Sequence, residues 1–212
     1  MQVNLIGIAG PFGSGKTLYA TSLGINFLRN NPTKFLFTNY PLKNLGELED
    51  RWEQYKFEDI SKDILPENYK NGLMIIDEIQ VGADAYDFLK DDVRNKMDFV
   101  NQIRKNDLEL IVVAPNFDFF ISRLRKLLTH FVILNPMVEE GIINARWFER
   151  ILVSSTFEVR QFENPVIKDL SDYFKYYDTK YIVKKEPVKK KEEIKKVVNP
   201  KKKKESVNVE DE

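Results

Sequence analysis

The sequence predicts an α/β fold in which a mostly parallel central sheet is flanked by helices and carries an antiparallel edge. An apolar run at residues 3–9 leads into a glycine-rich loop and then into a helical pattern at 18–30. Two further apolar runs, 73–76 and 108–114, follow long polar segments, as parallel strands joined by crossover connections require. Late in the chain, the runs 145–153 and 157–162 are separated by a short turn, which is typical of an antiparallel pair.

Composition limits the possible classes of protein. The chain has 212 residues, of which 42% are hydrophobic, enough for the core of one α/β domain. It has no cysteine, which excludes a disulfide framework, a thiolate zinc site and a cysteine nucleophile. No signal pattern and no apolar run of membrane-spanning length is present, so we expect a soluble protein without an integral membrane segment. One folded domain is predicted over residues 1–183.

A lysine-rich tail is predicted over residues 184–212. It holds eleven Lys against seven Asp or Glu, so a formal net charge of zero for the whole chain leaves about −4 on the remainder. The tail has almost no large apolar residues, so it cannot bury enough surface to offset the entropy lost on ordering. We therefore expect the tail to be disordered. The tail either attracts nucleic-acid phosphates without sequence specificity or is a solvated segment that aids solubility.

The loop after the first apolar run has the spacing G-x-x-x-x-G-K-T. Its glycines can adopt backbone angles that turn successive N–H groups toward a phosphate. Lys16 is expected to reach the β- and γ-phosphates of ATP, and the Thr17 hydroxyl to hold Mg²⁺, at the start of a helix whose dipole favours anions. The alternative is a glycine-rich turn that binds no nucleotide. The predicted nucleotide-binding residues are Gly10, Pro11, Phe12, Gly13, Ser14, Gly15, Lys16 and Thr17.

The first half of the chain supplies the elements around this loop. Residues 3–9 form the first strand, which we expect to lie centrally, and residues 18–30 form a helix that ends before Pro32. Residues 35–38 form a second strand. The charged segment 45–64 is predicted to hold one or two short helices and receives no function.

Two consecutive carboxylates follow the apolar strand at 73–76. Packing gives no reason for charge at the end of a buried run, so Asp77 is predicted to orient the water shell of Mg²⁺ and Glu78 to act as the base that polarises the attacking water. Phosphotransferases need no such base, whereas hydrolysing ATPases do. The pair therefore indicates a P-loop NTPase of the ASCE type, and the alternative is a polar strand end in solvent.

The next predicted elements are a helix at 92–104 and a core strand at 108–114. Asn116 follows that strand, where a polar side chain could sense the γ-phosphate. The alternative is that Asn116 caps a turn after Pro115.

Residues 117–128 are predicted to form a helix and 131–134 a strand. An arginine finger would come from the residues near the ends of core elements, since a planar, permanently charged group suits a phosphoryl transition state. Arg123 and Arg104 are favoured, and a surface salt bridge or a solvated charge is the alternative for each. His130 is interpreted as an edge residue with a satisfied ring. The arginines near the ends of core elements, from which the finger would come, are Arg94, Arg104, Arg123 and Arg125.

These motifs together resemble the zonula-occludens-toxin-like branch of the FtsK/HerA P-loop ATPases, which are filamentous-phage assembly and viral genome-packaging motors. The resemblance rests on GPFGSGKT, on Thr38-Asn39 after the second strand, and on MIIDEIQ at 74–80. In the segment 102–107, Arg104 and Asp107 match the family pattern. Ala114-Pro115-Asn116 stands in place of its usual Thr-Gln strand end, and the run 173–180 is similar to its closing Tyr-x-Thr segment.

The resemblance implies an oligomeric ring, usually a hexamer, in which ATP lies between subunits, a neighbour provides the arginine finger and the ring translocates double-stranded DNA. A lysine-rich tail stands where toxin-like assembly proteins carry a membrane segment, which favours viral genome packaging. A capsid or portal protein would be a further partner, and the location would be the host cytoplasm or the virion. Three alternatives stay open: a partner-driven assembly or secretion ATPase, a nucleotide or small-molecule kinase, and a non-hydrolysing nucleotide-binding regulator.

Overall fold

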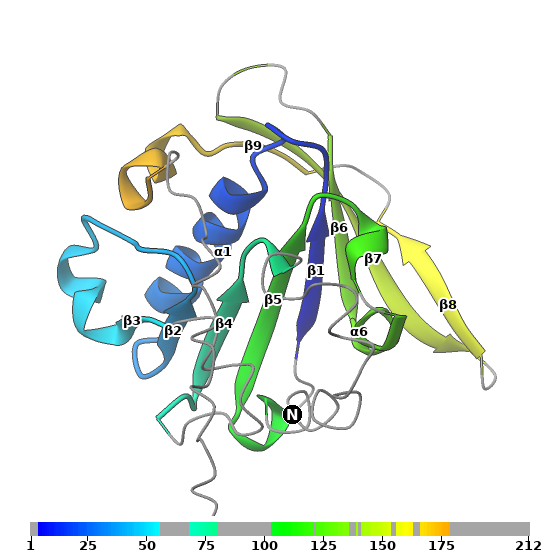
Figure 1. The fold of residues 1–212 in the computed structure, drawn as a ribbon, viewed down its shortest axis with the longest axis horizontal. Coiled ribbons are helices and arrows are strands. Elements are labelled where there is room, and N and C mark those ends of the chain that lie inside the picture. Colours follow the sequence, from blue (N-terminus) through cyan, green and yellow to red (C-terminus); the bar gives the residue numbers. More distant parts are fainter. Residues whose placement is uncertain are drawn as a thin grey trace, which may run out of the picture.

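The structure is a computed structural model, and it describes residues 4–55, 68–79, 103–120, 122–135, 139, 141–153, 156–162 and 166–178 (Figure 1). The tail predicted at 184–212 lies outside the described residues. So do Arg94 and all but the end of the helix predicted at 92–104. In the part of the chain that is described, no helix combines the length and apolarity needed to cross a membrane.

The described residues form a nine-stranded sheet of order β3-β2-β4-β5-β1-β6-β7-β8, with β9 paired to β7. All pairings from β3 to β6 are parallel, and β7 is antiparallel to β6, β8 and β9. The predicted mostly parallel sheet with an antiparallel edge is therefore confirmed. The strands are β1 (Leu5–Ala9), β2 (Phe35–Thr38), β3 (Trp52–Gln54), β4 (Gly72–Ile76), β5 (Leu108–Ala114), β6 (His130–Leu134), β7 (Ile142–Val153), β8 (Thr156–Gln161) and β9 (Val166–Asp169).

Helix α1 (Lys16–Asn30) covers one face of the sheet (Figure 1). Ile75 of β4 and Val113 of β5 share a buried cluster with residues of this helix. Their neighbours Met74 and Val112 point to the opposite face, where Ile103, Phe120 and Leu124 are buried. Because both faces are covered, the central strands are apolar along most of their length, which explains the long apolar runs in the sequence.

The segment after β2 differs in part from the prediction of short helices at 45–64. A 3₁₀ helix, η1 (Gly46–Arg51), is present, but Trp52–Gln54 continue as the edge strand β3. The indole Nε1 of Trp52 donates to Oγ1 of Thr38, 2.9 Å away. This contact with β2 is non-local, so helical periodicity could not indicate it. Residues 56–67 lie outside the described part.

The single helix predicted at 117–128 is wrong. The structure has a short 3₁₀ helix, η2 (Phe117–Phe119), and a separate helix, α6 (Ser122–Leu127). Between them Phe120 is extended and fully buried, and its ring meets that of Phe117 edge to face at 5.5 Å. Burial of this ring in the core interrupts the helix. Strand β9 and the 3₁₀ helix η3 (Ser171–Tyr176) were not predicted.

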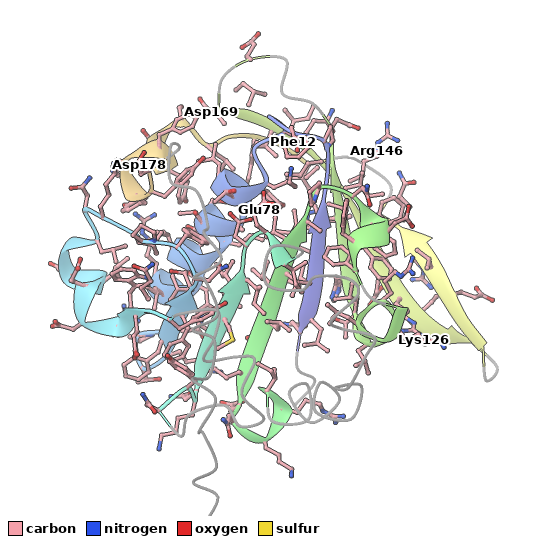
Figure 2. All side chains as sticks on the ribbon, viewed as in Figure 1. Phe12, Glu78, Lys126, Arg146, Asp169 and Asp178 are labelled. Carbon is pink, nitrogen blue, oxygen red and sulfur yellow. The ribbon has the colours of Figure 1, made fainter. Side chains whose placement is uncertain are left out.

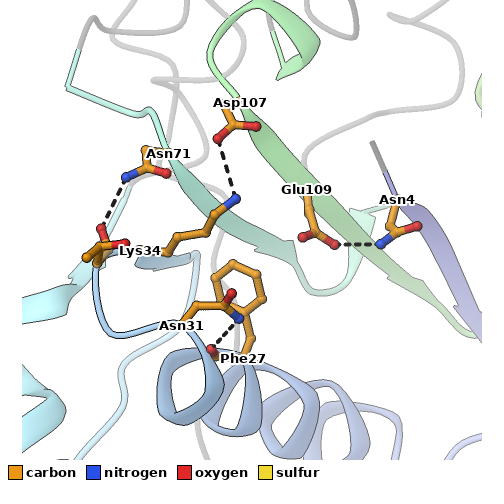
Figure 3. A network of polar contacts seen from close by, with 8 residues as sticks. Asn4, Phe27, Asn31, Lys34, Asn71, Asp107 and Glu109 are labelled. Carbon is orange, nitrogen blue, oxygen red and sulfur yellow. Dashed lines mark hydrogen bonds and ion pairs between the residues drawn. The ribbon is translucent and has the colours of Figure 1, made fainter. Parts of the chain in front are cut away.

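The parallel strands β1 to β6 begin at one edge of the sheet, here called the amino edge, and end at the opposite, carboxyl edge. Polar side chains join the segments along the amino edge (Figure 3). The Lys34 ammonium lies 3.4 Å from the Asp107 carboxylate, and Nδ2 of Asn4 donates to Glu109 at 2.9 Å. Asn71 donates to the carbonyl of Thr33 at 3.1 Å. The loops after β1, β4 and β5 all lie at the other, carboxyl edge.

Candidate functional site

The glycine-rich loop runs from the end of β1 into α1. Gly13 and Gly15 have φ angles of 75° and 76°, in the left-handed region that side chains disfavour. At Gly10 a Cβ atom would come within 2.7 Å of both the Leu134 carbonyl oxygen and Ser14 Oγ. The glycines are therefore required by the shape of the loop.

Lys16 begins α1 and folds back over this loop. Its Nζ donates to the carbonyl oxygens of Gly10 and Pro11, each 2.9 Å away, and only 7% of the residue is exposed. Burial lowers the pKa of Lys16, and the nearby charges of Glu78 and Asp77 oppose that shift. The ammonium also lies 5.6 Å from the centroid of the Phe12 ring, which is 82% exposed at the tip of the loop (Figure 2).

Thr17 and Asp77 meet across 60 residues of sequence. The Thr17 hydroxyl donates to Oδ2 of Asp77 at 2.8 Å. Asp77 follows β4 and is buried, and this desolvation raises its pKa to about 6, although the Thr17 hydrogen bond acts in the opposite direction. A hydroxyl and a carboxylate, both oxygen ligands of the kind that Mg²⁺ prefers, are therefore in contact at the carboxyl edge.

Glu78 lies beside this pair, between α1 and the end of β4 (Figure 2). Its φ angle is 52°, which a side chain other than glycine seldom adopts. Its N–H donates to Oδ1 of Asp77 at 3.0 Å, so the two oxygens of Asp77 accept from Thr17 and from the Glu78 backbone. The unusual backbone angle coincides with the residue predicted to be the base, as strained residues at functional sites do.

Asn39 is a residue of this site to which the sequence analysis gave no role. It follows β2, is 4% exposed, and makes two hydrogen bonds with the backbone of Asp77. Next to it, the buried hydroxyl of Tyr40 lies 3.0 Å from Oγ1 of Thr21 in α1. The available signal was an Asn directly after an apolar strand, which becomes informative only once β2 is known to neighbour β4.

Two of the other predicted catalytic residues, Asn116 and Arg104, do not join this cluster. Asn116 is exposed, and its Oδ1 accepts from the Asp118 N–H at 2.9 Å, so it caps η2. Arg104 is exposed at the amino edge, before β5, whereas the glycine-rich loop lies at the carboxyl edge. Arg123 lies in α6, and its side chain is outside the described part. The sensor and finger roles stay predictions.

Two further polar residues that the sequence analysis singled out, Arg125 and His130, have structural partners. Arg125 lies 3.5 Å from Asp118, an exposed ion pair. Nδ1 of His130 lies 3.0 Å from Oγ1 of Thr129, and its ring meets Trp147 edge to face. These contacts match the interpretation that the His130 ring is satisfied, although His130 begins β6, which lies between β1 and β7 in the sheet.

The loop is suited chemically to a phosphate group. It leads into the amino end of a 15-residue helix, where backbone N–H groups lack helical partners. The buried ammonium of Lys16 lies against the same loop. The Oγ of Ser14 in the same loop is buried and has no hydrogen-bond partner among the described residues. A buried hydroxyl without a partner is costly in a folded protein unless a ligand satisfies it. The residues present therefore fit a nucleotide phosphate.

Comparison with known proteins gives a fold relationship. No protein-family model and no curated protein matches the sequence. Among solved structures, the fold is similar to the N-terminal domain of zonular occludens toxin from Neisseria meningitidis, with a TM-score of 0.54 and 18% sequence identity. The match covers 84% of this chain and 100% of that domain. The resemblance predicted from the motifs is confirmed at the level of the fold.

Two further matches are structures of the genome packaging NTPase B204 from Sulfolobus turreted icosahedral virus 2. The complex with AMP matches with a TM-score of 0.48 at 12% identity, covering 76% of this chain and 98% of that one. The complex with AMPPCP matches with a TM-score of 0.47, also at 12% identity and with the same coverage.

Proposed function

We propose that this protein is a Mg²⁺-dependent ATPase of the P-loop class and that it acts as a motor on double-stranded DNA in viral genome packaging. The observation that carries the ATPase proposal is the contact between Thr17 and Asp77, 2.8 Å apart, with Glu78 as the next residue. A metal ligand from the loop, one from a strand end and an adjacent base are the parts that hydrolysis of a phosphoanhydride needs.

The strand order supports placement in the ASCE type. Strand β5 lies between β1, which leads into the loop, and β4, which leads into Asp77 and Glu78. This insertion separates the strand that leads into the loop from the strand that leads into the carboxylates by one strand. Because β5 lies between β1 and β4, Asn116, which follows β5, comes from the strand next to both the loop strand and the carboxylate strand. A γ-phosphate sensor would act from that position.

Each residue has a defined task in this proposal. Thr17 and Asp77 would hold Mg²⁺, whose positive charge offsets the charge that develops on the phosphate oxygens. Lys16 would exchange its hydrogen bonds to the loop carbonyls for contacts with phosphate. Glu78 would take the proton of the attacking water, which requires it to be ionised and fixed in direction.

The DNA part of the proposal is supported by the motif order shared with packaging and assembly motors and by the lysine-rich composition of residues 184–212. A homo-oligomeric ring, in which a neighbour supplies the arginine finger, follows from the same resemblance. Arg104 suits that role because it is exposed and lies away from its own loop. Contact with a capsid or portal protein would complete the packaging assembly.

The test is steady-state ATP hydrolysis with and without linear double-stranded DNA, at low and moderate salt. It uses the full chain and a chain that ends after Tyr181. Stimulation of both by DNA would support a motor with its DNA contacts in the folded domain, and stimulation of the full chain alone would make the lysines the DNA contact. Hydrolysis that ignores DNA would contradict the packaging motor, and the partner-driven assembly ATPase would replace it.

A further inference from the structure

We infer that Asn39 is a positioning residue that sets the direction of Asp77 and Glu78, and that ATP turnover depends on it although it touches neither carboxylate group. This inference rests on the proposed ATPase function. It begins from the end of β2, where the last backbone pairing with β4 joins Thr38 to Ile75. Beyond that pair the chain of β2 turns away from the sheet.

The side chain of Asn39 continues the pairing after the backbone leaves. Its Oδ1 accepts from the N–H of Asp77, and its Nδ2 donates to the carbonyl oxygen of Asp77, both at 2.8 Å. A side-chain amide therefore takes the place of the next peptide group of β2. Both polar atoms of the Asn39 amide, Oδ1 and Nδ2, are hydrogen-bonded to Asp77. Because the residue is only 4% exposed, water does not compete for these hydrogen bonds.

These bonds fix the peptide group between Asp77 and Glu78. Asn39 holds its carbonyl oxygen, and the carboxylate of Asp77 holds its N–H at 3.0 Å. Both ends of the peptide that precedes Glu78 are therefore held, and this fixes one side of the rotation that gives Glu78 its left-handed φ of 52°, an angle that a free chain would seldom adopt. Asn39, directly after β2, thus helps to set the direction in which the Glu78 side chain leaves the backbone.

The same clamp also acts on Asp77. Oδ2 of Asp77 meets Thr17, 2.8 Å away, only while its backbone holds the present orientation at the end of β4. Rotation of the 77–78 peptide would move the metal ligand and the base together. A purely structural role for Asn39 would instead affect stability without separating turnover from nucleotide binding.

The experiment compares Asn39→Asp and Asn39→Ala with the full-length protein. Asp has nearly the volume of Asn and keeps an acceptor for the Asp77 N–H, but it places an oxygen against the Asp77 carbonyl. We expect kcat to fall by at least about tenfold in both variants while KM for ATP changes by less than about threefold, as loss of orientation rather than of binding predicts. The matched control is Asn106→Ala, which removes a 3.0 Å side-chain bond to the Tyr69 carbonyl at the amino edge and should leave kcat unchanged.

Hydrogen exchange separates this inference from the proposed function. The Asp77 and Glu78 amides should lose protection in Asn39→Ala, which removes the acceptor of the Asp77 N–H, and keep it in Asn106→Ala, whether or not the protein hydrolyses ATP. If the variants show this difference in protection but the wild-type protein does not hydrolyse ATP, the ATPase proposal fails and the positioning role stands. Unchanged protection, or a kcat within twofold of wild type in both Asn39 variants, would overturn the positioning role.

Discussion

The carboxyl and amino edges of the sheet are both rich in polar side chains, but among the described residues only those at the carboxyl edge are deeply buried. Asp77, Asn39 and Lys16 are 5%, 4% and 7% exposed. At the amino edge, the side chains of Lys34 and Asp107 are 19% and 53% exposed. Burying charge costs free energy that a solvated ion pair does not require, so the carboxyl edge carries a cost that packing alone does not explain.

The two edges also differ in what their polar contacts hold. The carboxyl-edge contacts converge on Asp77, through a hydroxyl, a side-chain amide and a neighbouring N–H. The amino-edge contacts are separate pairs that link neighbouring segments (Figure 3). Convergence on one acidic residue, through its carboxylate and its backbone, is the arrangement expected of a site, and separate pairs are the arrangement expected of a surface.

The largest expected effect is at Glu78. Glu78→Gln keeps the size and the backbone of the residue but cannot accept a proton, so turnover should fall by at least about 100-fold. Binding of ATP should stay within about threefold of wild type, because no predicted contact with phosphate is lost. Phosphate release together with equilibrium binding of ATP checks both. Full turnover in this variant would remove Glu78 from the mechanism.

Asp77→Asn should reveal the cost of the buried carboxylate. Because the pKa of Asp77 is raised to about 6, the folded state binds a proton more tightly than the unfolded state, so wild type loses stability as pH rises from about 4 to about 6. Asn carries no charge and can still meet Thr17 and the Glu78 N–H. At pH 7.5 the variant should be more stable than wild type by about 1–3 kcal/mol.

Urea unfolding of both proteins without nucleotide, at pH 4.5 and at pH 7.5, measures this difference. The gain in the variant should be small at the lower pH and full at the higher one. A variant less stable than wild type at pH 7.5 would show that the carboxylate stabilises the fold, and the contrast between the two edges would lose its basis.

Substitution of Arg51 is expected to have an effect of intermediate size, and the quantity that it changes is the free energy of unfolding. Its Nη1 donates to the carbonyl oxygens of Leu28 and Asn31, each at 2.9 Å, where α1 ends. Arg51→Ala should lower the free energy of unfolding by about 1–2 kcal/mol, since carbonyls at a helix end lose a charged donor. The control is Arg125→Ala, which removes only an exposed contact of 3.5 Å. Equal losses in the two variants would contradict this explanation.

The smallest effect is expected at the amino edge. A double-mutant cycle of Lys34→Met and Asp107→Asn should give a coupling of about 0–1 kcal/mol, because the pair is partly solvated. Asn is chosen because Asp107 has a φ of 52°, which Asn tolerates. Thermal or urea unfolding measures the coupling. A coupling above about 2 kcal/mol would make the amino edge as demanding as the carboxyl edge and would break the comparison.

The meeting of Thr17 with Asp77 could be predicted from the sequence because both follow apolar runs, and the carboxyl ends of parallel strands share one edge of a sheet. The site residues that depend on non-local geometry could not. Asn39 gains its role only because β2 ends at Thr38, opposite Ile75 of β4 and two residues before the level of Asp77. The break between η2 and α6 depends on a core position for the Phe120 ring, which helical periodicity does not encode.

The measurement that tests the account most directly is equilibrium binding of ATP to wild type and to Thr17→Val, each with Mg²⁺ and with EDTA. Val keeps the shape of Thr17 and removes the hydroxyl that contacts Asp77. Wild type should bind ATP at least about tenfold more tightly with Mg²⁺, and the variant should lose that difference. No binding of ATP by wild type, or Mg²⁺ dependence that survives in the variant, would contradict the assignment of Thr17 and Asp77 to one Mg²⁺–nucleotide site.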